Sequence, residues 1–198
     1  MSENRAISDL SDQEWKNVRN NYHIPNQGMP AQYIREVLYE VDDILKSHNI
    51  KYFLSCGTAL GLHRDGDFIP WDDEIDIEIF SESFAPVLAQ LRESFIEKGF
   101  IARATFRGNT SKMPVFKHGI KVALSSLYHD GNGFRCDLNQ KFPERFYDNP
   151  DTYTLDDRDF RIPGPIEEYL TFYYGDWKVP IKSYDVNEYL NKDKKWRK

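Results

Sequence analysis

The sequence lacks long apolar runs, has few cysteines and has no excess of positive charge. Without a run of about 18 apolar residues it encodes no membrane-spanning helix, and its polar first residues contain no apolar signal core. Two cysteines, Cys56 and Cys136, are too few for a disulfide scaffold, so we expect reduced thiols in a cytoplasmic protein. The 32 acidic residues outnumber the 26 basic ones, for a net charge of −6. This balance argues against a nucleic-acid binder, which needs a basic face.

Aromatic residues are abundant, at 15% of the 198 residues. The favoured interpretation is a core built on aromatic rings. The alternative is a surface that stacks sugars or bases, since rings offer amphipathic faces.

Hydrophobic periodicity predicts one α/β (α+β) domain over 30–198. The polar segment before it, 1–29, is expected to contain a short helix that begins at a capping box, Ser11–Glu14. Apolar residues at spacings of three and four predict an amphipathic helix over 31–48. We expect further helices at 58–63, 84–95, 165–175 and from 185 onward, and strands at 52–55, 75–80, 100–106, 134–139 and, as one or two strands, 115–128. This order predicts a small mixed sheet flanked by helices.

An acidic cluster over residues 65–78 is the strongest chemical signal. Two carboxylates about 4 Å apart repel by roughly 1 kcal/mol in water and about 4 kcal/mol in a partly buried site. The cluster is therefore either a solvated acidic edge or a cation site. Glu74 and Asp76 project from one face of a strand and can share a hard divalent ion such as Mg²⁺ or Mn²⁺. The seven carboxylates are Asp65, Asp67, Asp72, Asp73, Glu74, Asp76 and Glu78.

Three neighbouring features favour the cation site. Gly57-Thr58 follows a strand, and such a turn presents backbone N–H groups and a hydroxyl to a phosphate, although the dipeptide often forms only a turn. Arg64 suits phosphate oxygens, or else pairs with Asp65 or Asp67. Asp137 interrupts an apolar strand, as a structural carboxylate, a third metal ligand or a general base.

Two longer motifs carry a family resemblance. The run GTALGLHR at 57–64 followed by IPWDDEIDI at 69–77 resembles the LicD family, which includes phosphocholine transferases and fukutin-type ribitol-phosphate transferases. The run YGDW at 174–177, after Tyr169-Leu170 and before Pro180, is similar to the family's C-terminal element. The resemblance covers about residues 31–180. It departs at Glu74, where the family usually has Asp.

The resemblance implies a nucleotidyltransferase-like fold and a metal-dependent transferase that moves phosphocholine or a polyol phosphate from a CDP-linked donor to a glycan hydroxyl. It implies Mg²⁺ or Mn²⁺ on Glu74, Asp76 and Asp137, with Asp137 accepting the hydroxyl proton. Trp177 or Tyr174 would wall the acceptor or head-group pocket, or only pack in a helix. The implied donor-binding residues are Gly57, Thr58, Arg64, Asp72 and Asp73. Lys112, Lys117 and Lys121 flank the donor or are simply solvated.

Two other functions stay open. A nucleotidyltransferase on the same fold would transfer NMP from an NTP and release pyrophosphate. A calcium module is the non-enzymatic alternative, although Asp65-Gly66-Asp67 lacks the downstream spacing of an EF-hand. The basic tail, 191–198, is either a solvated helix end or a peripheral contact with an anionic membrane.

Overall fold

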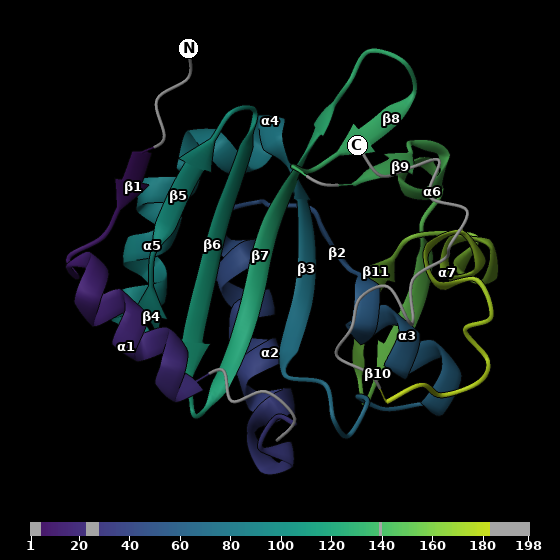
Figure 1. The fold of residues 1–198 in the computed structure, drawn as a ribbon, viewed down its shortest axis with the longest axis horizontal. Coiled ribbons are helices and arrows are strands. Elements are labelled where there is room, and N and C mark those ends of the chain that lie inside the picture. The colour runs from purple at the N-terminus through teal and green to yellow at the C-terminus, as the bar shows by residue number, and fades with distance from the viewer. Residues whose placement is uncertain (1–4, 23–27, 139, 183–198) are drawn as a thin grey trace.

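The computed structural model describes residues 5–22, 28–138 and 140–182, and its centre is a mixed β-sheet (Figure 1). In this part of the chain the strands run in the order β1-β5-β6-β7-β3-β2, with β4 beside β6 and β8 between β7 and β9. Strands β3 and β7 pair in parallel and the other pairs are antiparallel. The strands are β1 (Arg5–Ile7), β2 (Tyr52–Leu54), β3 (Glu74–Phe80), β4 (Ile101–Ala102), β5 (Ala104–Arg107), β6 (Thr110–Lys117), β7 (Ile120–His129), β8 (Phe134–Cys136) and β9 (Lys141–Pro143).

Helices cover both faces of this sheet (Figure 1). Helices α2 and α5 lie behind it, α1 crosses its front, and α3 and α7 gather at the end formed by β3 and β2. The α/β prediction of a mixed sheet flanked by helices is therefore confirmed. The helices are α1 (Asp12–Tyr22), α2 (Ala31–Ser47), α3 (Cys56–Asp65), α4 (Ser81–Phe84), the 3₁₀ turn η1 (Ala85–Val87), α5 (Leu88–Glu97), α6 (Arg145–Asp148) and α7 (Ile166–Tyr174).

The two N-terminal helices form as their sequences predict. In α1, the Glu14 N–H donates to Ser11 Oγ and the Ser11 N–H donates to Glu14 Oε2, which completes the expected capping box. Helix α2 buries its apolar stripe against the core, because residues three and four apart share one helix face. The stripe consists of Ile34, Val37, Leu38, Val41, Ile44 and Leu45.

Several element boundaries differ from the prediction. The helix expected over 84–95 is divided into α4, η1 and α5, and Pro86 lies in the 3₁₀ turn. The strand expected over 100–106 breaks at Arg103, opposite Pro114, which has no N–H to donate. The segment 115–128 is the hairpin β6–β7, which begins earlier, at Thr110, and turns at His118 and Gly119 with positive φ.

The strand expected over 134–139 is also shorter. Strand β8 ends at Cys136, and Asp137 lies in the turn that follows. The Asp137 N–H donates to the Gln140 carbonyl, and the Gln140 N–H donates to Asp137 Oδ1. The interpretation of Asp137 as a residue inside a strand is therefore wrong. The predicted helix from 185 and the basic tail lie outside the described residues.

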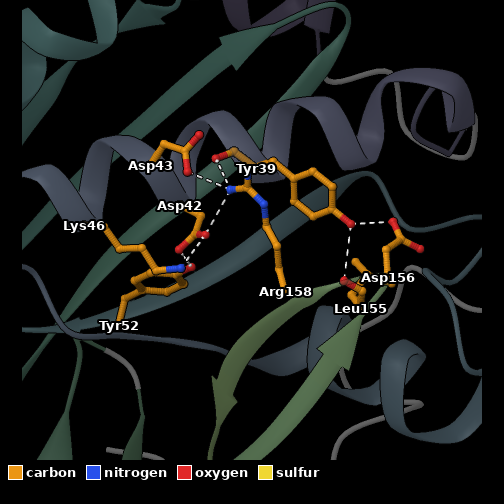
Figure 2. A network of polar contacts seen from close by, with 8 residues as sticks. All are labelled: Tyr39, Asp42, Asp43, Lys46, Tyr52, Leu155, Asp156 and Arg158. Atoms are coloured by element: carbon orange, nitrogen blue, oxygen red, sulfur yellow. Dashed lines mark hydrogen bonds and ion pairs between the residues drawn. The ribbon is translucent and has the colours of Figure 1, made fainter.

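A hairpin that the sequence did not predict, β10 (Asp151–Leu155) and β11 (Arg158–Ile162), is fastened to α2 by a polar network (Figure 2). Asp42 of α2 is fully buried and accepts hydrogen bonds from the Tyr52 hydroxyl at 2.7 Å and the Arg158 guanidinium at 3.2 Å. Lys46 lies 2.8 Å from the same carboxylate. The network fixes the hairpin beside β2, so it covers that edge of the sheet.

The abundant aromatic residues lie largely in the core, which is the interpretation favoured from the sequence. The largest fully buried side chains include Tyr169 and six phenylalanines. Across the described ranges, no helix combines the length and the hydropathy needed to span a bilayer.

Candidate functional site

The Gly57 turn lies directly against the carboxylate strand β3. The Gly57 N–H, in the first turn of α3, donates to Asp76 Oδ2 at 3.1 Å. In return the Asp76 N–H donates to Thr58 Oγ1 at 2.9 Å, and the Ser55 N–H donates to the Asp76 carbonyl. The start of α3 and the start of β3 are therefore locked together, and Asp76 has a fixed orientation.

The strand β3 has the expected alternation. Ile75, Ile77 and Ile79 are buried in the core, whereas Glu74 and Asp76 project from the other face and are partly buried. Glu74 forms an ion pair with Lys121 of β7, its register partner on the neighbouring parallel strand.

A third carboxylate, Asp72, lies directly against the backbone of Gly57. A Cβ added at Gly57 would lie 2.5 Å from Asp72 Oδ2, so a glycine is required for this approach. The loop before β3 holds Asp72 in place, because Asp72 Oδ1 accepts the Asp73 N–H at 3.0 Å. Asp72 and Asp76 thus both lie against the first turn of α3, and Glu74 lies between them in the sequence.

These carboxylates line a cavity of about 450 Å³. The lining is partly acidic and partly aromatic and apolar, and most of the aromatic and apolar part comes from α7 and the segment after it. The acidic wall consists of Asp72, Asp73, Glu74 and Asp76, beside Cys56 and Gly57. The other lining residues include Trp71, Tyr173, Tyr174, Asp176, Trp177, Val179 and Ile181.

Crowding and burial perturb the acidic wall. Burial, with the nearby charges of Glu74 and Asp73, raises the pKa of Asp72 to about 7. Burial, with the charges of Glu74 and Asp72, also raises the pKa of Asp76 well above its usual range, and Lys121 opposes this shift. Carboxylates this close favour either a proton or a bound cation.

The donor set fits a hard divalent ion bound with substrate. Mg²⁺ usually takes one or two protein carboxylates and fills its other positions with phosphate oxygens and water, so Glu74 and Asp76 suffice. Within the described residues, no group of three or more His, Cys, Asp or Glu side chains is arranged to hold a metal ion. The metal therefore stays a prediction.

Asp137 is not among the described residues that line the cavity. The charge of Asp137 acts on Glu78. Burial is the main cause that raises the pKa of Glu78 to about 8, and the Asp137 charge adds to this shift. Glu78 is 6% exposed and accepts a hydrogen bond from the Tyr147 hydroxyl at 2.9 Å. Glu78 is a buried acid that sequence reasoning did not single out, although the strand alternation placed it on the same face as Asp76.

Arg64 forms the ion pair with Asp65 that was one of its two predicted alternatives. It lines the cavity, yet its Nε and Nη2 donate to the two carboxylate oxygens of Asp65 at 2.8 and 2.7 Å. Its Nη1 donates to the Trp177 carbonyl at 3.3 Å, which ties α3 to the aromatic wall. Thr58 is buried and holds Asp76 through its hydroxyl.

The aromatic wall includes both rings named from the sequence. Tyr174 and Trp177 line the cavity. Tyr173 and Trp71 line it too, although the sequence did not distinguish them from aromatic residues that only pack in the core. The Trp177 Nε1 donates to Thr171 Oγ1 at 3.1 Å, so this ring is held by α7.

Both cysteines are free thiols, as expected, and burial raises the pKa of Cys56, which lines the cavity.

Several known proteins are similar to most of this chain. An uncharacterized protein of Rickettsia prowazekii, RP689, is 28% identical over 163 residues, which cover 81% of this chain and 55% of that protein. The mouse ribitol-5-phosphate transferase FKTN is 25% identical over 76% of this chain and 34% of its own length. Mouse FKRP, a ribitol 5-phosphate transferase, is 26% identical over 66% of this chain and 24% of its own. The chain thus spans about half of the bacterial relative, about a third of FKTN and about a quarter of FKRP.

Among solved structures, that of ANT(2″)-Ia in complex with adenylyl-2″-tobramycin aligns with 65% of this chain and 68% of its own, at 11% identity and a TM-score of 0.44. The family model described as LicD/FKTN/FKRP, nucleotidyltransferase domain, matches residues 49–170. This range is more than half of the chain and includes the Gly57 turn, the carboxylate strand and Asp137. The chain belongs to the LicD family.

Proposed function

We propose that this chain is a metal-dependent transferase that moves a substituted phosphate from a CDP-linked donor to a hydroxyl of a carbohydrate acceptor. The observation that carries the proposal is the cavity, which Glu74 and Asp76 line together with aromatic rings, in a chain of the LicD family. The ribitol-phosphate transferases among its relatives support transfer of a phosphate that bears an alcohol.

The acidic wall would bind the reacting diphosphate through a metal. A bound Mg²⁺ or Mn²⁺ would neutralise charge on the transferred phosphoryl group. Glu74 and Asp76 would hold that ion, and the hydrogen bond from Gly57 to Asp76 keeps one of these ligands oriented. Asp72 and Asp73 would complete the acidic surroundings of the ion through bound water.

The donor's phosphates need positive groups as well. Arg64 lines the cavity, and its pairing with Asp65 holds the guanidinium plane in place. The first turn of α3 adds the positive end of the helix dipole, although its Cys56 and Gly57 N–H groups already donate to Tyr169 and Asp76. We propose that Arg64 and the positive end of the Gly57 turn bind the diphosphate.

The aromatic wall would receive the acceptor or the head group. Sugar rings stack on the apolar faces of aromatic side chains, and Tyr and Trp also offer a polar edge. Tyr174 and Trp177 are therefore proposed as the stacking surface.

Asp137 remains the proposed base for the acceptor hydroxyl, on the strength of its match to the family pattern. Its place beside Glu78, away from the cavity lining, makes the role directly testable. If Asp137 is the base, Asp137→Asn will lower turnover by roughly 10²-fold or more and leave Mn²⁺ affinity unchanged. If it is a ligand, the same variant will weaken both.

The experiment that tests the proposed function is a substrate panel. The purified chain is incubated with CDP-choline, CDP-ribitol, CDP-glycerol or each NTP, with Mg²⁺ or Mn²⁺ and with carbohydrate acceptors, and CMP and pyrophosphate are quantified. We expect CMP from at least one CDP-alcohol, dependent on metal and absent in Asp76→Asn. Pyrophosphate from an NTP, with no CMP from any CDP-alcohol, would instead identify a nucleotidyltransferase.

A further inference from the structure

The face of the sheet that carries the carboxylates also carries a lysine, Lys121, in register with Glu74. Strands β3 and β7 are parallel neighbours, and Glu74, Asp76 and Glu78 pair with Lys121, Ala123 and Ser125. Side chains at paired positions point to the same face. The Lys121 stem therefore begins one strand away from Glu74, and its ammonium forms an ion pair with that carboxylate.

This ion pair is partly shielded from water. The side chains of Lys121 and Glu74 are 22% and 26% exposed. Among the described residues, Arg64 is the one cation that lines the cavity, and its guanidinium already binds Asp65 at both carboxylate oxygens. Lys121 is thus a second positive charge at the acidic wall, and it is held on the very carboxylate that the proposed function gives to a metal ion.

We infer that Lys121 is a positioning residue that acts as a tethered counter-ion: it occupies Glu74 while the carboxylate site holds no metal, and a divalent ion must displace it to bind. The inference rests on the proposed function, because it takes Glu74 and Asp76 as the metal ligands. The backbone of Lys121 lies in β7, between β6 and β3, so the start of its side chain is fixed. The flexible four-carbon stem lets the ammonium group move away from Glu74.

The consequence is a site that binds metal weakly when no other ligand is present. Displacing Lys121 removes an ion pair, and the displaced ammonium still repels the divalent ion from a few ångströms away. Donor phosphates bring negative charge that offsets this repulsion, so we infer that the metal enters together with the diphosphate rather than before it.

The test is a measurement of metal affinity alone. Mn²⁺ is titrated calorimetrically into the wild-type chain, Lys121→Met, Lys121→Arg and Lys112→Met. Lys112 is a matched control, since it lies on the same face but on β6, paired with Ser125 and two strands away from β3. We expect Lys121→Met to bind Mn²⁺ roughly tenfold more tightly, because a nearby unit charge and a competing partner are both removed. Lys121→Arg and Lys112→Met should stay within about twofold of wild type.

A lysine with a purely structural role would give the opposite sign, because its loss could only loosen the ligands. Equal or weaker Mn²⁺ binding by Lys121→Met therefore overturns the inference, and so does equally tightened binding by Lys112→Met. Lys121→Gln replaces the Met variant if circular dichroism shows that the latter is unfolded. If neither wild type nor Lys121→Met binds Mn²⁺, the metal in the proposed function fails as well. If wild type binds Mn²⁺ and Lys121→Met is unchanged, only the role of Lys121 fails.

Discussion

Replacing Gly57 with alanine tests whether the site depends on the close approach of Asp72 to the first turn of α3. The new Cβ would lie 2.5 Å from Asp72 Oδ2, whereas ordinary contacts begin at 3.4 Å, so the carboxylate must retreat by about 0.9 Å. Gly57 has no positive φ, so the backbone itself accepts alanine. The effect of Gly57→Ala must therefore come from Asp72.

Two opposing terms set the size of the effect. Alanine is favoured over glycine within a helix by up to about 1 kcal/mol. Against this, the retreat of Asp72 breaks the hydrogen bond that Asp72 Oδ1 accepts from the Asp73 N–H, worth about 1 kcal/mol, and adds strain of similar size. We expect Gly57→Ala to be destabilised by about 1 kcal/mol at pH 6, where Asp72 is mostly protonated and charge repulsion contributes little.

A double-mutant cycle with Asp72→Ala isolates the contact. Without the Asp72 carboxylate the clash disappears, so Gly57→Ala should become neutral or stabilising by up to about 1 kcal/mol. The coupling free energy should therefore be about 1 to 2 kcal/mol, measured by urea denaturation in EDTA. Turnover of Gly57→Ala should fall by roughly 10²-fold, because a shift of about 1 Å is enough to spoil reacting geometry. A coupling below about 0.5 kcal/mol would refute the contact as the cause.

Three further variants test separate parts of the structure. Asp76→Asn should abolish metal-dependent turnover and, in EDTA at pH 8, raise the melting temperature by relieving carboxylate crowding; full activity would show that Asp76 is no ligand. The raised pKa of Glu78 means that the folded state binds this proton more tightly, so the contribution of Glu78 to stability is fully present below about pH 4.5 and is lost, by about 3 to 5 kcal/mol, as pH rises through 8. Glu78→Gln in EDTA should remove that fall, and an unchanged pH profile of unfolding would contradict the assignment. Asp42→Asn should cost about 2 to 3 kcal/mol in urea denaturation because Asp42 is fully buried, whereas its exposed neighbour variant Asp43→Asn should cost under about 1 kcal/mol; equal costs would contradict the role of the network.

Local periodicity predicted the parts of the fold that bury one regular stripe. Helix α2 and strand β3 follow from spacings of three to four and of two, because each pattern places its apolar side chains on one face. The junction of Gly57 with Asp76 also followed, since a glycine turn after one buried strand and a carboxylate at the start of the next lie at the same sheet edge.

The remainder depends on contacts distant in sequence. The β10–β11 hairpin turns at Asp156, which has a φ of 54°, a value that usually calls for glycine. Because an aspartate stands there instead, the sequence lacks the glycine that would have indicated a turn. Its position depends on Asp42 and Arg158, which are 116 residues apart. Asp137 was placed inside a strand because its neighbours are apolar, but the hydrogen bonds with Gln140 form a turn there instead.

The width of the cavity depends on a further set of long-range contacts. The Cys56 N–H, at the start of α3, donates to the hydroxyl of the buried Tyr169 in α7 at 3.2 Å. At the other end of α3, Arg64 donates to the Trp177 carbonyl. The acidic wall is fixed to the same helix through Gly57 and Asp76. Helix α3 therefore contacts both sides of the cavity, through hydrogen bonds in which a backbone group takes part, and helps to set the distance between the carboxylates and the rings. A single segment, residues 56–64, therefore orients the Asp76 carboxylate and contacts the aromatic side of the cavity.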